Sequence, residues 1–255
     1  MIEANWGAAT RLSLGVEEEV MILDAETLEP RAAVDVLLRG AEGLTLPGRL
    51  KTELHASIVE LNTNVCASPD EAAAAIAELR RAAHGIARRN GLVIAAAGTH
   101  PFAPHDAMPV VQEERYLAMI DGVGYAARRQ GVNGLHVHVA MDGGDECWER
   151  LEAIVPWLPV LLAVSANSPW LSGESTGMLS NRAPILAELP RSGAPPAFRA
   201  YADWEAWVER LVGVGVFEDH TRLWWDVRPN PRFGTLEIRV PDQPTALERT
   251  VAFCA

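Results

Sequence analysis

Ionisable residues spaced two apart, in segments of alternating hydrophobicity, are the groups of this 255-residue chain best placed to do chemistry. The pairs are Glu17 with Glu19, His136 with His138, and Glu237 with Arg239. Residues two apart on a β-strand point to the same face, so each pair places two functional groups side by side. Two carboxylates about 7 Å apart repel each other by about 2 kcal/mol at an effective dielectric constant near 20. A cluster of such acids is stable only with cations, and oxygen ligands favour Mg²⁺ or Mn²⁺.

Residues 52–63 add two further carboxylates, Glu53 and Glu60. Their separation of seven is odd, so one regular strand would place them on opposite faces. A bulge or break near Ala56 or Ser57 would let both side chains point to one site. Either such a break brings Glu53 to the other acids, or Glu53 is an ordinary surface residue.

Alternation of apolar and polar residues predicts the strands that would carry these groups. The predicted strands are residues 12–23, 59–63, 92–97, 135–141, 221–228 and 234–241. In the first of them, Glu18 interrupts the apolar face, which predicts a position near the edge of that face. Because nearly all these strands have only one apolar face, we expect an antiparallel sheet with helices on its apolar side. The fold class predicted from the residues is therefore α+β.

Helices are predicted between these strands. Ser68 and Pro69, followed by two acids, mark the start of a helix that ends near Arg89. The other predicted helices are residues 111–130, residues 145–166 with a bend at the prolines, residues 203–212 with Asp203 as cap, and residues 245–255. The last of these is apolar and is expected to pack on other elements.

Composition excludes several classes of protein. The chain has 22 basic and 34 acidic residues and a net charge of −12, so no basic surplus exists to neutralise nucleic-acid phosphates. Three widely spaced cysteines indicate neither a disulfide framework nor a zinc ribbon. The longest apolar run, residues 154–166, contains two prolines and is too short to cross a bilayer. Because the N-terminus shows no signal-peptide pattern, we predict a cytoplasmic protein without nucleic-acid or membrane partners.

Other polar residues are predicted to have ordinary structural roles. His55, His84, His100 and His105 are each expected to be surface or loop residues, and the pair Arg80-Arg81 is expected to lie on a solvated helix face. The chain has no phosphate-binding GxxxxGK[ST] loop and no GxSxG motif. If the protein handles phosphate, metals and arginines must therefore bind it.

Seven short segments together carry a resemblance to a known family. They are residues 15–19 (GVEEE), Glu53 with residues 60–63 (ELNT), 134–138 (GLHVH), 167–170 (NSPW), 177–182 (GMLSNR), 225–229 (WDVRP) and 234–239 (GTLEIR). In this order, and over nearly the whole chain, they resemble the type 2 glutamate–cysteine ligase family. More narrowly, they are similar to its bacterial carboxylate–amine ligase branch.

The resemblance implies a glutamine-synthetase-like catalytic domain, in which a curved, mostly antiparallel sheet forms a funnel that holds ATP and divalent metals. The implied ligands of Mg²⁺ or Mn²⁺ are Glu17, Glu19, Glu53, Glu60, His136 and Glu237. The implied catalytic residues are Glu237 and Arg239, with Arg239 facing the transferring phosphoryl group. The implied substrate-binding residues are Arg182, as an anchor for a carboxylate or phosphate, together with His138 and Arg228. Relatives further suggest a homodimer.

The implied reaction is ATP-dependent amide formation through an acyl phosphate, and glutamate and cysteine are the family's named substrates. Specificity for the amine is expected in loops such as residues 104–112 and 172–191. Family members continue past the position that matches Ala255, so residues 1–255 are expected to form one catalytic domain without the C-terminal helical part.

Two alternatives stay open. In the first, His136 and His138 bind zinc in an amide hydrolase with Glu60 as general base. In the second, the chain is a truncated, non-catalytic domain that binds a nucleotide or a metal.

Overall fold

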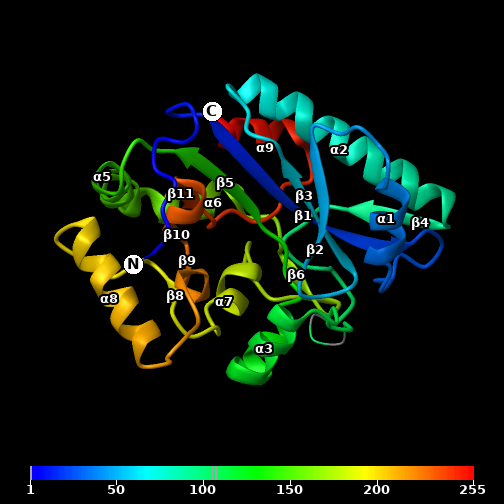
Figure 1. Ribbon diagram of the computed structural model, residues 1–255. Coiled ribbons are helices and arrows are strands. Elements are labelled where there is room, and N and C mark those ends of the chain that lie inside the picture. The colour runs from blue at the N-terminus through cyan, green and yellow to red at the C-terminus, as the bar shows by residue number, and fades with distance from the viewer. Residues whose placement is uncertain (1, 105, 107) are drawn as a thin grey trace.

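A seven-stranded sheet forms the centre of the protein, for which a computed structural model describes residues 2–104, 106 and 108–255 (Figure 1). Its strand order is β10-β11-β5-β1-β3-β2, and β4 pairs with the far end of β1. All neighbouring strands are antiparallel. The bounds are β1 Leu14–Asp24, β2 Gly48–Thr52, β3 Ile58–Thr63, β4 Leu92–Ala95, β5 Leu135–Ala140, β10 Val227–Asn230 and β11 Thr235–Ile238. This architecture confirms the predicted α+β class.

Helices α1, α2 and α9 pack on one face of the sheet, and α5 and α8 pack at its β10–β11 end (Figure 1). The helix bounds are α1 Val34–Ala41, α2 Pro69–Arg89, α3 Glu114–Val123, α4 Tyr125–Arg128, α5 Gly144–Ile154, α6 Leu158–Ser165, α7 Arg182–Leu186, α8 Tyr201–Gly213 and α9 Leu247–Cys254. Two small sheets pair β6 (Trp170–Leu171) with β7 (Glu174–Ser175) and β8 (Ser192–Gly193) with β9 (Trp224–Trp225). In the described part of the chain, no helix has the length and apolar character needed to cross a membrane.

The apolar face of α2 packs against one face of the sheet. Its buried residues recur every three or four positions, which matches the period of an α-helix: Ala72, Ala75, Ile76, Leu79, Ala83, Ile86 and Ala87. They pack against the apolar face of β1 in one core cluster. The Ser68 side chain accepts a hydrogen bond from the Glu71 N–H at 3.2 Å, which confirms the predicted start of this helix.

The surroundings of Glu18 show that the predictions for Glu18 and Arg80 were wrong. Glu18 lies in the middle of this packed layer and not near an edge. Its carboxylate is fully buried and accepts hydrogen bonds from Arg80 at 2.6 and 2.7 Å. It also accepts one from the Thr250 hydroxyl at 2.6 Å. Arg80 is therefore not a solvated residue: it crosses the interface between α2 and β1 and donates as well to the carbonyls of Pro244 and Thr245.

Three predicted elements differ in the structure. Residues 221–228 are not one strand, because Asp219 caps a 3₁₀ turn at His220–Arg222 and β9 pairs in parallel with β8 outside the main sheet. Helix α8 begins at Tyr201 with Ala200 as its cap, which places Asp203 inside its first turn. The helix predicted at residues 111–130 is divided at Gly124, whose φ is +74°.

The buried Glu18–Arg80 pair predicts a large effect on stability. Replacing Arg80 with alanine leaves a buried carboxylate without its ionic partner, which typically costs about 3–5 kcal/mol of unfolding free energy. Urea denaturation followed by circular dichroism measures this loss. Arg81→Ala, an exposed position on the same helix, is the matched control and is expected to change stability by less than about 0.5 kcal/mol. Equal effects of the two substitutions would contradict the assignment.

Candidate active site

Polar side chains form three rows across the uncovered face of the sheet. Residues directly opposite on adjacent strands share a face, so the strand register alone brings distant segments together. The rows are Arg228–Glu237–His138, His136–Glu17–Asn62–Arg49 and Glu19–Glu60–Lys51. The polar residues of the alternating segments therefore lie together on one surface of the sheet.

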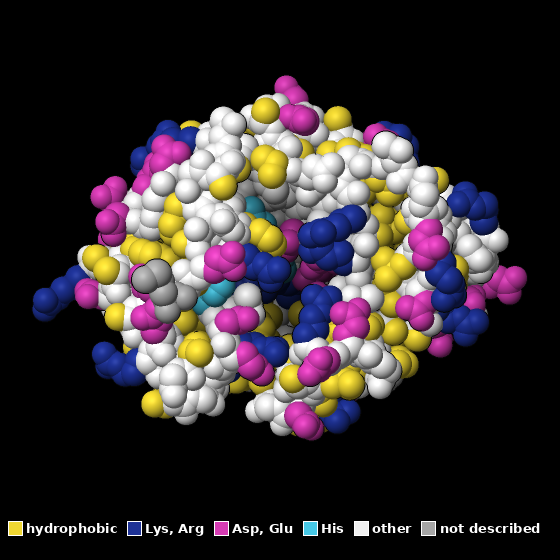
Figure 2. All heavy atoms as spheres, viewed as in Figure 1, with side chains coloured by type: hydrophobic (Ala, Val, Ile, Leu, Met, Phe, Trp, Pro, Cys, Tyr) yellow, Lys and Arg dark blue, Asp and Glu magenta, His cyan; other side chains and the backbone are white. Residues whose placement is uncertain are grey.

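A cavity of about 730 Å³ opens on this face. All the site residues implied by the resemblance line it: Glu17, Glu19, Glu53, Glu60, His136, His138, Arg182, Arg228, Glu237 and Arg239. Figure 2 shows a hollow in the middle of the molecule, with basic side chains around it and acidic and histidine side chains within it. The structure thus brings together groups that are more than two hundred residues apart in the sequence.

Glu53 reaches the cavity through a chain reversal, where the sequence predicted a bulge or break. Strands β2 and β3 are antiparallel neighbours, with Lys51 opposite Glu60, and residues 53–57 connect them. Glu53 follows the last residue of β2 and lies beside Glu60. The acids therefore meet at the turn end of the β2–β3 hairpin, and the odd spacing no longer separates them.

Glu19, Glu53 and Glu60 form the first group of acids, with one oxygen of each within 4.8 Å of the others. Burial and the charge of Glu53 raise the pKa of Glu19 to about 8. Burial and the charge of Glu17 raise the pKa of Glu60 to about 7, although Lys51 Nζ lies 3.1 Å from its Oε1. Without a cation, this group relieves its repulsion by holding protons.

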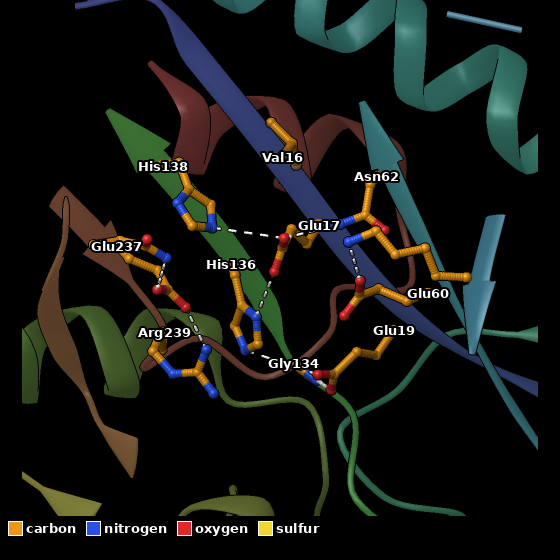
Figure 3. Close-up of polar contacts among 12 residues, drawn as sticks. Val16, Glu17, Glu19, Glu60, Asn62, Gly134, His136, His138, Glu237 and Arg239 are labelled. Atoms are coloured by element: carbon orange, nitrogen blue, oxygen red, sulfur yellow. Dashed lines mark hydrogen bonds and ion pairs between the residues drawn. The ribbon is translucent and has the colours of Figure 1, made fainter. Parts of the chain in front are cut away.

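Glu17, His138 and Glu237 form the second group, again with ligand atoms within 4.8 Å of one another (Figure 3). His138 Nδ1 lies 2.9 Å from the Thr235 hydroxyl, which orients the ring. Its Nε2 is buried without a hydrogen-bond partner and lies 3.7 Å from Glu17 Oε1. Two carboxylates and an unpartnered imidazole nitrogen fit a divalent metal ion.

His138, and not His136, belongs to this group, which departs from the ligand set implied by the resemblance. His136 Nδ1 lies 3.2 Å from Glu17 Oε2, and its Nε2 lies 3.8 Å from Glu19 Oε1 (Figure 3). Burial and the charge of Arg239 lower the pKa of His136 to about 4. The ring is neutral at pH 7 and sits between the two groups, since its strand neighbour on β1 is Glu17 rather than Gly15.

Glu237 stays ionised although it is buried, because two arginines surround it. Arg228 contacts it through two nitrogens at 2.8 and 3.1 Å, and Arg239 Nη1 also contacts it. Burial alone would raise the pKa of Glu237, but Arg228 and Arg239 hold it well below its ordinary value. The remaining guanidinium nitrogen of Arg228 donates to the carbonyls of Thr221 and Leu223. Arg228 therefore acts on Glu237, and the geometry gives little support to its predicted contact with a substrate.

Asp242 anchors the segment that carries Arg182, and nothing in the sequence motifs drew attention to it. This fully buried carboxylate accepts hydrogen bonds from the hydroxyls of Ser168 at 2.6 Å and Ser180 at 2.8 Å, and from the Asn167 N–H at 2.8 Å. Its one sequence signal is its position shortly after Glu237 and Arg239. Asp242 thus fastens residues 167–182 to the segment that follows β11.

Arg182 is held tightly against the sheet by this anchor. Its guanidinium donates to the carbonyls of Val240 at 3.2 Å and Arg239 at 3.1 Å. A Cβ on Gly134 would lie 2.2 Å from an Arg182 nitrogen, so only glycine allows this approach. The Gly134 N–H in turn donates to Glu19. One chain of contacts therefore runs from Asp242 through Arg182 to the first group of acids.

Of the histidines predicted to be surface or loop residues, His84 is exposed on α2, and His55 and His100 lie outside the helices and strands. His55 and His100 are buried, and His100 lies 2.9 Å from the Leu28 carbonyl and accepts hydrogen bonds from the N–H groups of two following residues. His105 lies outside the described residues. The three cysteines are buried free thiols, as expected for structural residues.

Comparison with known proteins gives one family. The family model described as glutamate–cysteine ligase family 2 (GCS2) matches residues 13–255. Two relatives are named "Putative glutamate--cysteine ligase 2-3" and "Putative glutamate--cysteine ligase 2". The Rubrobacter xylanophilus relative is 39% identical over 100% of this chain and 70% of its own length. The Herpetosiphon aurantiacus relative is 39% identical over 94% of this chain and 62% of its own length. The chain thus spans about two thirds of these relatives.

Solved structures share the fold at low sequence identity. A bifunctional glutathione synthetase from Pasteurella multocida matches with a TM-score of 0.61 and 14% identity, over 91% of this chain and 36% of that one. A glutamate–cysteine ligase from Francisella tularensis, solved in complex with AMP, matches with a TM-score of 0.59 and 14% identity. That match covers 96% of this chain and 66% of the other. These likenesses show that the sheet architecture is shared.

The raised pKa values of Glu19 and Glu60 predict a pH-dependent stability. Between about pH 5 and 8 the folded protein holds protons that the unfolded chain, with an ordinary glutamate pKa near 4.5, releases. The unfolding free energy in EDTA is therefore expected to fall as pH rises through this range. Thermal melts from pH 5 to 8.5 measure the slope, and a Glu19→Gln/Glu60→Gln variant is expected to flatten it. An unchanged slope in the variant would count against these assignments.

The Asp242 anchor predicts that removing its carboxylate frees Arg182. In the Asp242→Ala variant, Ser168 and Ser180 lose their acceptor, and the Arg182 guanidinium is expected to become accessible to phenylglyoxal. Mass spectrometry of the peptide that contains Arg182 measures this modification. Glu18→Gln, a buried carboxylate behind the sheet, serves as the control and is expected to leave Arg182 protected. Protection in both variants would show that Asp242 does not position this residue.

Proposed function

The chain belongs to glutamate–cysteine ligase family 2, and from this membership we propose that it is an ATP-dependent ligase that joins a carboxylate to an amine. The observation that supports this proposal most directly is that one cavity gathers all ten site residues implied by the resemblance, which are five glutamates, two histidines and three arginines. A nucleotide triphosphate and a substrate carboxylate are both anionic. An acid-lined cavity binds them only with cations, and the arginines supply part of that charge.

Each of the two ligand groups is suited to hold a divalent metal ion. We propose Mg²⁺ or Mn²⁺ at Glu19, Glu53 and Glu60 and at Glu17, His138 and Glu237, because these donors are mostly hard oxygens. When bound, such ions would offset the negative charge of the phosphates as the γ-phosphoryl group is transferred. Thr235 and Asn62 hold His138 and Glu17 in orientation for this role.

In the first proposed step, an oxygen of the substrate carboxylate attacks the γ-phosphorus of ATP. The bond from that phosphorus to its bridging oxygen breaks, which gives an acyl phosphate and ADP. Arg239 lies in the cavity wall with its Nε free of hydrogen-bond partners, so it can donate to a phosphoryl oxygen where negative charge develops. Glu237 fixes the other side of this guanidinium through Nη1.

In the second proposed step, the amine attacks the acyl carbon. A C–N bond forms and the bond from the acyl carbon to the phosphate oxygen breaks, so inorganic phosphate leaves with the electron pair of that bond and takes up the proton that the nitrogen gives up. Arg182, buried beside the first group of acids, is placed to anchor a carboxylate or phosphate during this exchange. Because the relatives are named as glutamate–cysteine ligases, glutamate and cysteine are the first pair of substrates to assay.

The zinc hydrolase alternative gains no support from the geometry. That mechanism needs both imidazoles on one ion, whereas each ligand group found among the described residues holds at most one imidazole.

Glu237→Gln is expected to lower amine-dependent ADP release at least about 100-fold, because it removes the charge that a metal ion and Arg239 both use. A coupled ADP-release assay with Mg²⁺, glutamate and a panel of amines measures turnover. Glu174→Gln, an exposed glutamate outside the cavity, is the matched control and is expected to keep wild-type activity. Unchanged turnover in the Glu237 variant would refute the proposed role.

A further inference from the structure

One wall of the cavity is apolar and has no part in the proposed chemistry. Six of its residues also belong to a single hydrophobic cluster: Leu54, Tyr116, Met119, Leu186, Leu189 and Trp224. Helix α3 supplies two of them, α7 and the turn after it supply two more, and β9 supplies Trp224. These residues, which we name the apolar wall, present a continuous surface to whatever occupies the cavity.

The apolar wall adjoins the first group of acids. Leu54 directly follows Glu53, and the Tyr116 hydroxyl donates to the Thr52 carbonyl at 2.8 Å. Burial and the nearby charge of Glu53 raise the pKa of Tyr116. A molecule that reacts at the acids is therefore within reach of the wall.

Gln130 lines the same cavity and carries an unused acceptor. Its Nε2 donates to the carbonyls of Ala126 at 3.0 Å and Ile185 at 2.9 Å, which fixes the orientation of the amide. Its Oε1 consequently has no donor, although the residue is only 7% exposed. A buried acceptor without a donor costs free energy, and an N–H from a ligand would satisfy it.

Basic groups lie close to the apolar wall. The Arg115 guanidinium is 4.3 Å from the centre of the Tyr116 ring, and Lys51 Nζ is 3.1 Å from Glu60 Oε1. Both residues line the cavity. An apolar surface flanked by acids and by basic groups matches a molecule with an apolar side chain, an ammonium group and a carboxylate.

We infer that one of the two condensing substrates is an amino acid with a bulky apolar side chain, which lies against the apolar wall. This inference rests on the proposed ligase function and names a substrate class for it. A charged or strongly polar side chain there would lose its hydration without gaining partners. Cysteine would cover little of the wall, and each additional buried carbon is worth about a fourfold gain in affinity.

Adenine is a poorer occupant of this wall. Its base edge presents a donor and an acceptor. Gln130 Oε1 beside the wall could accept from the donor, but the Tyr116 hydroxyl is already committed to the Thr52 carbonyl. Within the apolar wall itself, a ring nitrogen would be left without a donor. The wall therefore suits a side chain better than a base.

The inference is tested by ADP release with a size series of amino acids. Glycine, alanine, cysteine, valine, leucine and phenylalanine are each assayed together with glutamate. Within each pair, either amino acid can supply the carboxylate that is phosphorylated while the other supplies the amine. Leucine has three more carbons than alanine, so at about fourfold for each carbon its kcat/KM is expected to be tens of times higher. Equal kcat/KM across the series, or a preference for cysteine, would overturn the inference.

Variants of the wall separate a side-chain pocket from a nucleotide pocket. Met119→Ala is expected to reduce the advantage of leucine over alanine about tenfold, with KM for ATP unchanged. Leu189→Ala, on a different element, is expected to act in the same way and guards against a folding defect in either variant. Leu117→Ala, which is 43% exposed on α3 and does not line the cavity, is the control. A rise in KM for ATP in place of the specificity change would overturn the inference.

A binding measurement distinguishes failure of the inference from failure of the proposed function. Equilibrium dialysis of labelled leucine and glycine, with Mg²⁺ and a non-hydrolysable ATP analogue, requires no turnover. Leucine is expected to bind at least about tenfold more tightly than glycine in the wild type and to lose this preference in Met119→Ala. Absence of turnover would refute the ligase proposal alone, whereas equal binding of leucine and glycine would refute the apolar pocket.

Discussion

Mutual repulsion of buried carboxylates is the constraint on which the rest of this structure depends. The two groups of acids reduce this repulsion in different ways. Glu237 stays ionised because Arg228 and Arg239 surround it, whereas Glu19 and Glu60, with pKa values of about 8 and 7, relieve the repulsion by holding protons. The surroundings therefore favour the ionised form of Glu237 and the protonated forms of Glu19 and Glu60. A cation that enters the protonated group replaces protons, so its binding is linked to pH.

The sheet can hold these mutually repelling carboxylates together because its other face packs against helices in a hydrophobic core. Buried apolar residues of α2 and β1 pack in one cluster behind the site, and the Glu18–Arg80 pair crosses the same interface. The energy that brings like charges close comes from apolar burial a few ångströms away. Asp242 extends this support to the segment that carries Arg182, which belongs to no strand of the main sheet.

Local periodicity explains which parts of the site were predictable. Alternation in residues 12–23, 135–141 and 234–241 shows which side chains share a face, because that depends only on the strand itself. The neighbour of each strand is a tertiary property, so the sequence could not choose between His136 and His138. Likewise, no pattern in one segment could show that Arg80 pairs with Glu18. Residues 221–228 alternate like a strand, but the cap at Asp219 and the pairing of β9 with β8 override that local preference.

The cavity divides its tasks between two kinds of element. Most of the groups proposed for chemistry lie on β1, β3, β5 and β11, where pairing with neighbouring strands fixes their positions. Most of the apolar wall lies on α3, α7 and the turn that follows α7, outside the main sheet. Met119 and Leu189 therefore line the cavity from elements that carry none of the proposed ligands of the metal ions. It follows that a single sheet can retain one reaction while substitutions on α3 and around α7 change the side chain that it accepts.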